Sequence, residues 1–305
     1  MKNSIQGIVL IVALFIVALI AVMAIAMMGR LTRDTYRTGF LLHNMQAYLY
    51  AEASVLWAEN QLLQDWIKKQ PDRLIDTLPL TLPAQTLNGY RIVATIEDAQ
   101  SKFNVNNLVN TSAQANFIRL LKITVPKLED QAAVAIAAAL TNWVTTGIHD
   151  STFDKYYLGL HPPYRAAHRA MVNVSELRMI KGITAPLYQA LLPFVIALPE
   201  QTQVNVQTAF WPVLASLSTN MDLASAEAVE RARQASPFVS VEKFLNLDVI
   251  KNHPVSRDKV TVTSSYFLVT TQVSIGMENY LFYTLLFRSV KENKPEIQKV
   301  WQSRI

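Results

Sequence analysis

The apolar segment at the N-terminus constrains the fold of this chain more than any other feature. Ile8 to Met28 is an unbroken run of 21 apolar residues, and a polar leader with one lysine, Met1 to Gly7, precedes it. As an α-helix, a run of this length rises about 31 Å, close to the thickness of the hydrocarbon core of a bilayer. The sequence therefore predicts a membrane-spanning helix over residues 8–28.

Three interpretations of this N-terminus are open. A secretory signal has a shorter apolar stretch with small residues at its cleavage site, and Ala24 and Ala26 imitate such a site. An uncleaved anchor fits equally well. The third interpretation is cleavage after Gly7, directly before the apolar run.

Basic residues follow the apolar run. Arg30, Arg33 and Arg37 mark the membrane edge on the side of the remaining chain. The positive-inside rule would keep these arginines in the cytoplasm. This rule therefore opposes the orientation with the globular part outside.

The helix is expected to continue well beyond the membrane. No proline interrupts the chain from Ile8 to about Lys69, and an apolar set recurs there at helical spacing: Leu42, Met45, Leu49, Leu56, Leu63 and Trp66. We predict one continuous helix whose second half packs on a globular domain through this set. The alternative is an anchor followed by a separate core helix.

Strand patterns lie on both sides of a helical middle. Lys68 to Leu87, with three prolines, is interpreted as a loop, and alternating apolar and polar residues predict a strand over Gly89–Asp98. β-Branched and aromatic residues predict a hairpin of Val260–Ile275 and Tyr280–Arg288 around a turn at residues 276–279. We expect one sheet to join the hairpin to Gly89–Asp98. A short strand is predicted at Lys102–Val105, and the polar tail over residues 291–305 is expected to be frayed.

The helical middle, from about Asn107 to Leu247, contains an internal repeat. The triplets Val172–Val174 and Val204–Val206 have the same sequence, Val-Asn-Val, and a capping residue and an apolar segment follow each. The first unit, with Gly182 between its segments, resembles a helix-hairpin-helix. Such hairpins often bind DNA phosphates, but they usually have two glycines, and the second position here is Thr184. DNA binding and a purely structural pair of hairpins both remain open.

The composition gives no indication of an enzyme or a nucleic-acid-binding surface. The chain has no cysteine, and its net charge of +5 is scattered rather than clustered. The five histidines show no compact metal-ligand spacing, and no nucleophile motif is present. We therefore nominate no catalytic residue.

Several segments together resemble the K-type minor pseudopilins of type II secretion systems. The resemblance covers most of the chain and includes the leader and anchor. The other segments that carry it are Gln46–Ala51, Lys102–Leu108, Tyr156–Leu158, Pro162–Ala167, Val174–Arg178 and Val204–Ala209. No single segment is decisive, but their order and spacing are specific.

The resemblance implies an α+β fold of the type IV pilin kind, with a long N-terminal helix and a small antiparallel sheet. A large all-α insertion with helix-hairpin-helix-like repeats would interrupt it. The expected parts are a leader (1–7), a membrane and filament-core helix (8–28), the first part of a pilin-like domain (29–110), an inserted helical domain (111–250), the C-terminal strands of the pilin-like domain (251–290) and a polar tail (291–305).

The resemblance also implies how the N-terminus is processed. A prepilin peptidase would cut after Gly7 and methylate the new N-terminus, Ile8. The fifth mature residue would be Val12, where most pilins have a glutamate that pairs with a neighbouring subunit's N-terminus. A subunit without that carboxylate suits the end of a filament better than its interior.

The implied protein is not an enzyme but a subunit at the tip of a short filament. It would sit in the bacterial inner membrane with a single pass and its globular part in the periplasm. Its implied partners are I- and J-type minor pseudopilins, the prepilin peptidase, the inner-membrane secretion platform and membrane lipid, with no nucleic acid. It would help to start filament assembly and to limit filament length for protein export. The alternative function is a membrane-anchored DNA-binding protein of a DNA-uptake system.

The family's helical domain can bind calcium, which implies one further site. In the corresponding loop only Asp150 and Asp154 are acidic. Calcium takes six to eight oxygen ligands, so carbonyl groups and water would have to supply the others. The alternative is a solvated turn with a capping aspartate.

Overall fold

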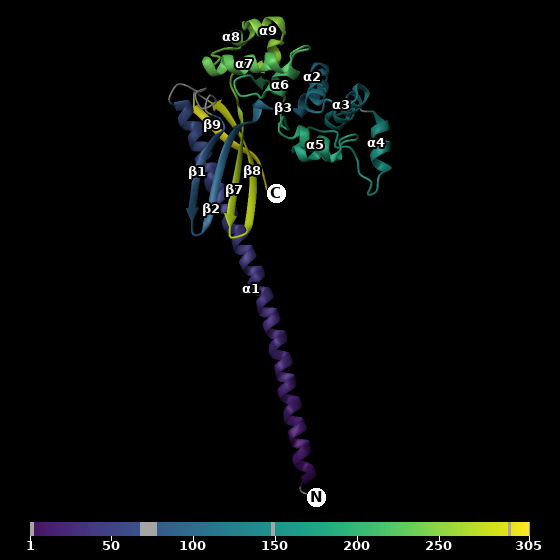
Figure 1. Ribbon diagram of the computed structural model, residues 1–305, viewed down its shortest axis with the longest axis vertical. Coiled ribbons are helices and arrows are strands. Elements are labelled where there is room, and N and C mark those ends of the chain that lie inside the picture. The colour runs from purple at the N-terminus through teal and green to yellow at the C-terminus, as the bar shows by residue number, and fades with distance from the viewer. Residues whose placement is uncertain (1–2, 68–77, 148–149, 292–293, 305) are drawn as a thin grey trace.

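The computed structural model of the chain describes residues 3–67, 78–147, 150–291 and 294–304. One helix, α1 (Asn3–Ile67), projects as a long stalk from the globular part (Figure 1). A five-stranded sheet lies along the second half of α1, and short helices cover the end of the sheet that is distant from the stalk. The prediction of one continuous helix is confirmed, and a separate core helix is excluded.

The face of α1 that packs on the sheet is not the one predicted from Leu42, Met45, Leu49 and Leu56. Of the other two predicted residues, Leu63 is half-buried, and the side chain of Trp66 lies outside the described residues. Leu42, Met45, Leu49 and Leu56 are 64%, 63%, 54% and 65% exposed. The buried residues of α1 lie on the opposite side of the helix, and all but the last are smaller than leucine: Ala47, Ala51, Ser54, Val55, Ala58 and Leu62. Alanine lets the helix backbone approach the sheet closely, so these residues rather than the larger leucines form the contact.

The sheet joins distant parts of the chain. Its order is β1 (Leu80–Leu87), β2 (Tyr90–Asp98), β7 (Tyr266–Ile275), β8 (Glu278–Lys291) and β9 (Lys294–Arg304), and all neighbours are antiparallel. The predicted hairpin and its pairing with the 89–98 strand are confirmed. The hairpin turn is shorter than expected, since only Gly276 and Met277 separate β7 from β8.

Both edge strands of the sheet lie in segments that were not predicted to be strands. The segment interpreted as a loop contains β1, where Pro83 falls in an irregularity of the register between Leu82 and Gln85. Proline is tolerated there because an edge strand has an unpaired side. The tail expected to fray forms β9, which pairs with β8 from Lys291↔Lys294 to Phe282↔Arg304. An edge strand pairs on one side only, and its other side can face solvent. A polar sequence is therefore compatible with an edge strand, although it gave no sign of pairing. The rest of the predicted loop, residues 68–77, lies outside the described residues.

The helical part is inserted between two neighbouring strands. Asp98 at the end of β2 pairs with Phe267 in β7, so the chain leaves the sheet and returns to it at adjacent positions. The insertion is wider than the expected 111–250, because Phe103, Val105 and Leu108 already belong to the core of the helical part. We call residues 99–265 the inserted lobe.

The inserted lobe has two cores. The first gathers residues from Phe103 to Ala197, and the second gathers residues from Val204 to Val262. The helices of the lobe are α2 (Thr111–Thr124), α3 (Asp130–Val144), α4 (Ser151–Leu158), α5 (Ala185–Leu191), α6 (Trp211–Ser216), α7 (Leu223–Ala235), α8 (Val241–Leu245) and α9 (Asp248–Asn252). The described residues of the lobe also form short 3₁₀ segments: η2 (Ala99–Ser101), η3 (Val105–Val109), η4 (Val174–Met179) and η5 (Arg257–Lys259).

The predicted short strand and the start of the predicted hairpin both lie in the lobe. β3 (Phe103–Asn104), within the predicted 102–105 strand, pairs in parallel with β4 (Val195–Ile196). Val260 and Thr261, expected to begin the hairpin, form β6 and pair with β5 (Val204–Asn205). These pairings close the two cores of the lobe.

Candidate assembly surface and domain junction

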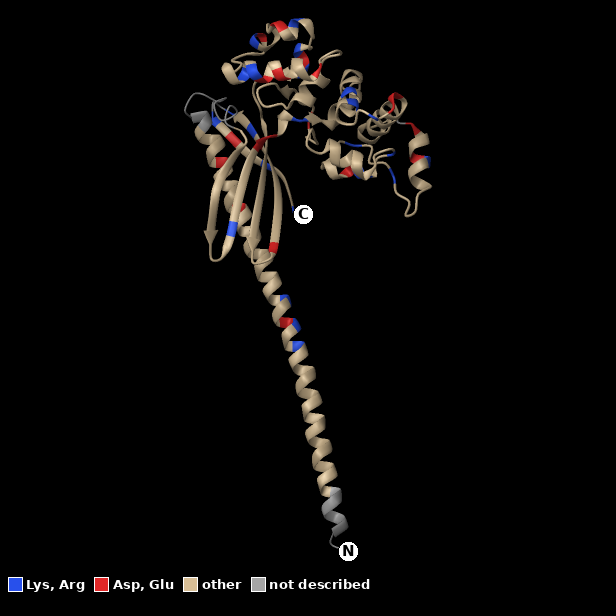
Figure 2. Ribbon diagram, viewed as in Figure 1, with Lys and Arg blue, Asp and Glu red and all other residues tan. Residues whose placement is uncertain are grey.

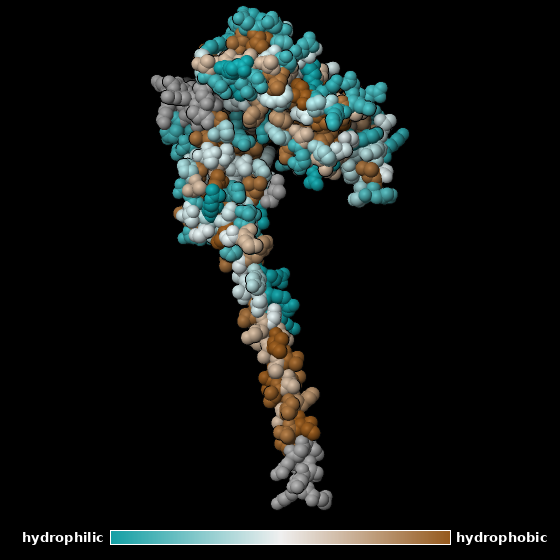
Figure 3. All heavy atoms as spheres, in the orientation of Figure 1, coloured by the Kyte–Doolittle hydropathy of each residue, from teal (hydrophilic) through white to brown (hydrophobic). Residues whose placement is uncertain are grey.

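The N-terminal half of α1 exposes apolar side chains all round. From Val9 to Met28 the large apolar residues are between 49% and 74% exposed, and none of the α1 segment apolar enough to span a membrane is buried within the chain. Figure 3 shows this part of the stalk in brown. A surface of this kind is stable only in lipid or against other apolar helices.

The exposed apolar surface continues beyond the membrane segment. Leu42, Met45, Leu49 and Leu56 form a stripe opposite the sheet, which we call the apolar ridge. Leu31, also exposed, lies on the same side because it precedes Leu49 by 18 residues, about five helical turns. The ridge is therefore a candidate surface for contact with other helices.

Gly7 and Ile8 both lie in the first turns of α1. The side chains of residues 3–8 lie outside the described part of the structure. Cleavage and methylation at this position therefore stay predictions. Val12 lies one turn further along and is 50% exposed.

Asp150 and Asp154 have roles in the structure of the loop and of α4. The Asp150 carboxylate caps α4 and accepts hydrogen bonds from the Thr152 amide (2.9 Å) and hydroxyl (2.7 Å), which lower its pKa. Asp154 Oδ1 lies 2.9 Å from His168 Nε2. This matches the capping-aspartate alternative.

The structure leaves the calcium site untested. The described residues contain no group of three or more His, Cys, Asp or Glu side chains placed to share a metal ion. Two carboxylates supply at most four of the six to eight oxygen ligands of calcium, so carbonyl groups and water would have to supply the others. Ile148 and His149 of this loop lie outside the described residues, and the calcium site stays a prediction.

The predicted hairpin around Gly182 differs from two α-helices joined by a turn. Its first segment, η4, is a 3₁₀ segment, and only α5 after it is an α-helix. Gly182 has a φ of +89°, and a Cβ added there would lie 2.9 Å from Cγ1 of Ile136. The glycine is thus explained by close packing on α3, without a phosphate ligand.

The junction between sheet and lobe is built on a buried carboxylate. Asp98 is 2% exposed, and its Oδ2 accepts hydrogen bonds from Asn205 Nδ2 (2.9 Å), Ser264 Oγ (2.8 Å) and the Thr208 hydroxyl. Its Oδ1 accepts a hydrogen bond from the backbone N–H of Gln100 (2.8 Å). Burial raises the pKa of Asp98, and the four hydrogen bonds oppose this shift because they stabilise the charged form.

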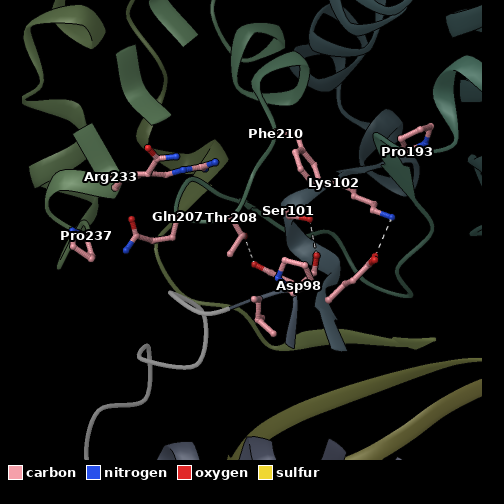
Figure 4. Close-up of a pocket in the computed structure, with 13 residues that line it drawn as sticks. Asp98, Ser101, Lys102, Pro193, Gln207, Thr208, Phe210, Arg233 and Pro237 are labelled. Atoms are coloured by element: carbon pink, nitrogen blue, oxygen red, sulfur yellow. Dashed lines mark hydrogen bonds and ion pairs between the residues drawn. The ribbon is translucent and has the colours of Figure 1, made fainter. Parts of the chain in front are cut away.

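A groove with a volume of about 680 Å³ lies beside this junction (Figure 4). Lys102 Nζ, 3.6 Å from Glu97, reaches its rim from one side. Arg233 closes the other side and donates hydrogen bonds to the backbone carbonyls of Val206 (3.1 Å) and Ala209 (2.7 Å). Phe210 also lines the groove and is 50% exposed. The cations here are therefore held by partners within the chain.

Asparagines hold the first core of the lobe together. Asn106 is 5% exposed; its amide donates to the carbonyls of Met171 (2.9 Å) and Leu198 (2.7 Å), and its oxygen accepts from the Met171 amide (2.8 Å). Asn104 accepts from the Leu198 amide (3.1 Å) and donates to the Glu200 carbonyl (2.7 Å). The segment Lys102–Leu108 thus connects chain segments far apart in the sequence.

The same chemistry explains the repeated Val-Asn-Val triplet. Asn173 and Asn205 each accept a hydrogen bond from the amide two residues later, at 2.9 Å from Ser175 and 3.0 Å from Gln207. Such a turn gives the backbone a local hydrogen bond that does not require an α-helix to follow. The repeat is visible in the sequence, and the equal position of the asparagine in both triplets is the signal that could have predicted these turns.

The chain is similar to proteins of one family along nearly its whole length. Residues 101–200 and 204–263 match two family profiles with the description type II secretion system (T2SS), protein K. The type II secretion system protein K of Klebsiella pneumoniae is 32% identical over 94% of this chain and 93% of its own length. That of Pseudomonas aeruginosa is 29% identical over 94% of this chain and 90% of its own length.

A solved structure has the same fold. A chain in the crystal structure of the GspK-GspI-GspJ complex from the enterotoxigenic Escherichia coli type 2 secretion system superposes with a TM-score of 0.71 at 24% identity. The match covers 88% of this chain and 99% of that chain. The two profile matches coincide with the two cores of the inserted lobe. This chain therefore belongs to the type II secretion system protein K family, the K-type minor pseudopilins.

Proposed function

We propose that this chain is the tip subunit of a pseudopilus, anchored in the bacterial inner membrane with its globular part in the periplasm. In this role it assembles with I- and J-type minor pseudopilins, helps to start filament assembly and limits filament length. The role is structural rather than catalytic, and protein export is the process that it serves. A prepilin peptidase processes the chain between Gly7 and Ile8, and the inner-membrane secretion platform receives it.

The observation that carries this proposal is the exposed apolar surface of α1. The membrane segment and the apolar ridge together expose large apolar side chains along most of a 65-residue helix. Burial of such area stabilises association by about 25 cal/mol per Å² before the costs of association. Neighbouring helices of sibling subunits are the partners that match a ridge of this length.

The place of the inserted lobe supports a terminal position. The lobe lies over the end of the sheet that is distant from the stalk and extends to one side of it (Figure 1). A subunit added above would have to share this space with the lobe. Val12, at the fifth mature position, also lacks the carboxylate that would pair with another subunit's N-terminus.

The mature N-terminus tests the processing step. We expect mass spectrometry of the protein purified from its native membrane to show a chain that begins with methylated Ile8. Gly7→Val should block cleavage, whereas Gly29→Val, in the same helix, should leave it unchanged. An intact Met1, or a cut near Ala26, would contradict the proposal.

Co-purification tests the partners. The full chain should be recovered with co-expressed I- and J-type subunits, and the double variant Leu49→Gln/Leu56→Gln should reduce recovery by about tenfold, since two exposed leucines leave the ridge. The matched control is Leu87→Gln/Val239→Gln, which changes two exposed apolar residues outside α1. Equal recovery of both variants would show that the ridge is not the contact.

The alternative of DNA binding has a direct test. A soluble fragment without the membrane segment should not shift duplex DNA at low salt, because Lys181 lies over the Tyr156 ring at 4.5 Å and Gly182 packs on Ile136. A shift that weakens with salt would favour the DNA-binding hypothesis.

A further inference from the structure

The three arginines after the membrane segment form a stripe on one side of α1. Arg30, Arg33 and Arg37 are spaced by three and four residues, which places them on a common face. All three are exposed, and no ion pair joins them to an acidic side chain in the described part of the chain. Figure 2 shows blue segments next to a red one on the stalk below the globular part.

The stripe lies on the sheet side of α1 and not on the apolar ridge. Arg33 and Arg37 precede Ala51 and Val55 by 18 residues each, about five turns, and both of those residues are buried against the sheet. The ridge, by contrast, continues downward through Leu31. A helix that packs on the ridge would therefore leave the guanidinium groups uncovered.

The other side of this segment has little free polarity. The hydroxyls of Thr32 and Thr35 donate to the carbonyls of Met28 and Leu31, both at 2.9 Å. Both threonines, together with Gly39, line a groove of about 770 Å³ along α1, and His43 and Glu278 line it where α1 meets the sheet. None of the three arginines lines this groove, so the arginine stripe faces a different direction.

We propose that Arg30, Arg33 and Arg37 bind the phosphate groups of anionic phospholipids at the surface of the leaflet beneath the globular part. This inference rests on the proposed membrane anchoring and adds a specific lipid partner to it. Arg30 is two residues past the end of the apolar run, and Arg37 follows about 10 Å further along, so the stripe lies at the depth of the headgroups.

The chemistry of the residues favours phosphate. A guanidinium group offers paired donors that match phosphate oxygens, and it stays charged under all relevant conditions. Positive charge on this side also opposes the positive-inside rule, so these arginines resist translocation of the globular part. A headgroup-binding role gives a reason for their presence despite that opposition. Asp34, between them, lowers the net charge of the stripe to about two.

The test uses the full chain in vesicles. The protein has no cysteine, so a single Gly29→Cys change labels the membrane edge without background, and a Cβ at this position meets nothing within 4 Å. A fluorophore on that cysteine is quenched by spin-labelled phosphatidylglycerol or, in parallel vesicles, by spin-labelled phosphatidylcholine. The ratio of the two apparent association constants measures the preference for the anionic lipid.

We expect a preference of roughly 25-fold, since each net charge contributes about fivefold near the surface. Arg30→Gln/Arg33→Gln/Arg37→Gln should abolish it. The matched control, Lys127→Gln/Arg231→Gln/Lys251→Gln, removes the same charge from exposed positions of the lobe and should retain it. Equal quenching by the two lipids, or equal loss in both triple variants, would overturn the proposal.

Two further features of the experiment make its outcome specific. One distinguishes lipid phosphate from free phosphate, and the other distinguishes lipid binding from the proposed function. Inorganic phosphate should compete no better than chloride at equal ionic strength, and specific displacement by it would indicate a free-anion site instead. The measurement contains no I- or J-type subunit, so it is independent of filament assembly. A failed test of processing or of partner binding would leave its result intact.

Discussion

The side-chain amide of Asn205 donates a 2.9 Å hydrogen bond to the carboxylate of Asp98, which lies 107 residues earlier in the chain. Asp98 ends strand β2, and Asn205 lies in β5, in the second core of the inserted lobe. Ser264, just before β7, donates to the same oxygen at 2.8 Å. One carboxylate thus connects three segments: the end of β2 where the chain leaves the sheet, the interior of the lobe, and the segment just before β7 where the chain re-enters the sheet.

Replacement of Asp98 should loosen the lobe from the sheet. Asp98→Ala leaves buried donors of Asn205, Thr208 and Ser264 without an acceptor, so we expect a loss of about 3 kcal/mol or more in the free energy of unfolding. Urea unfolding of a soluble fragment without residues 1–37 measures it. Asp248→Ala, with a side chain that is 97% exposed, is the control and should change stability by less than about 0.5 kcal/mol.

Asn106 should be as sensitive, but within the first core. Asn106→Ala removes the partner of the Met171 amide and of two buried carbonyls, and the expected loss is about 3 kcal/mol. Asn110→Ala is the control, because the Asn110 amide donates only to the exposed Gln201 side chain (2.8 Å). A similar unfolding midpoint for both variants would contradict the role given to Asn106.

Gly182 should tolerate alanine less well than another glycine of similar conformation. At Gly182 the new methyl group meets Ile136, whereas at Gly89, with a φ of +83°, it meets nothing within 4 Å. Both variants have a strained backbone, so overpacking should make Gly182→Ala less stable than Gly89→Ala by about 1–3 kcal/mol. Equal losses in thermal unfolding would show that the close contact has little effect.

The sheet should lose stability at high pH through Tyr280. Burial and the hydrogen bond from its hydroxyl to Glu278 (2.5 Å) raise its pKa to about 12. An unfolded tyrosine titrates near about pH 10, so the contribution of Tyr280 is complete below that pH and is lost as the pH rises towards about 12. We expect about 1 kcal/mol to be lost over this window, since solvent near the hydroxyl screens the Glu278 charge.

A pH series of urea unfolding checks this prediction. Tyr280→Phe should flatten the alkaline decrease, and Tyr48→Phe, a 43% exposed tyrosine of α1, should not. An identical slope in Tyr280→Phe and the unchanged protein would refute the assignment.

Calcium should not stabilise the lobe if Asp150 acts as a helix cap. We expect the thermal unfolding midpoint to stay the same with calcium or a chelator, and Asp150→Ala to lower the midpoint equally in either case, because it removes the helix cap. A bound ion would instead raise stability by about 2.7 kcal/mol at a concentration 100 times its dissociation constant. A midpoint shift that disappears in Asp150→Asn and persists in Asp130→Asn would establish the calcium site.

Local composition was enough to predict the long helix and the hairpin. The apolar run with no proline before the predicted loop determines α1, and the β-branched and aromatic residues after Tyr266 determine β7 and β8. The resemblance rested on short segments such as Lys102–Leu108, and the relatives of the chain support it. The processing site and the tip role also came from that resemblance, and they remain proposals.

Only the tertiary structure decided which side of α1 faces the sheet. Hydrophobicity pointed to Leu42, Leu49 and Leu56, but the sheet lies against Ala47 and Ala51, because close approach of a helix to a sheet depends on side-chain size as well as on polarity. The edge strands β1 and β9 and the contacts of Asp98 likewise depend on residues far apart in the sequence. Periodicity describes one segment at a time, whereas these contacts exist only when distant segments have already come together.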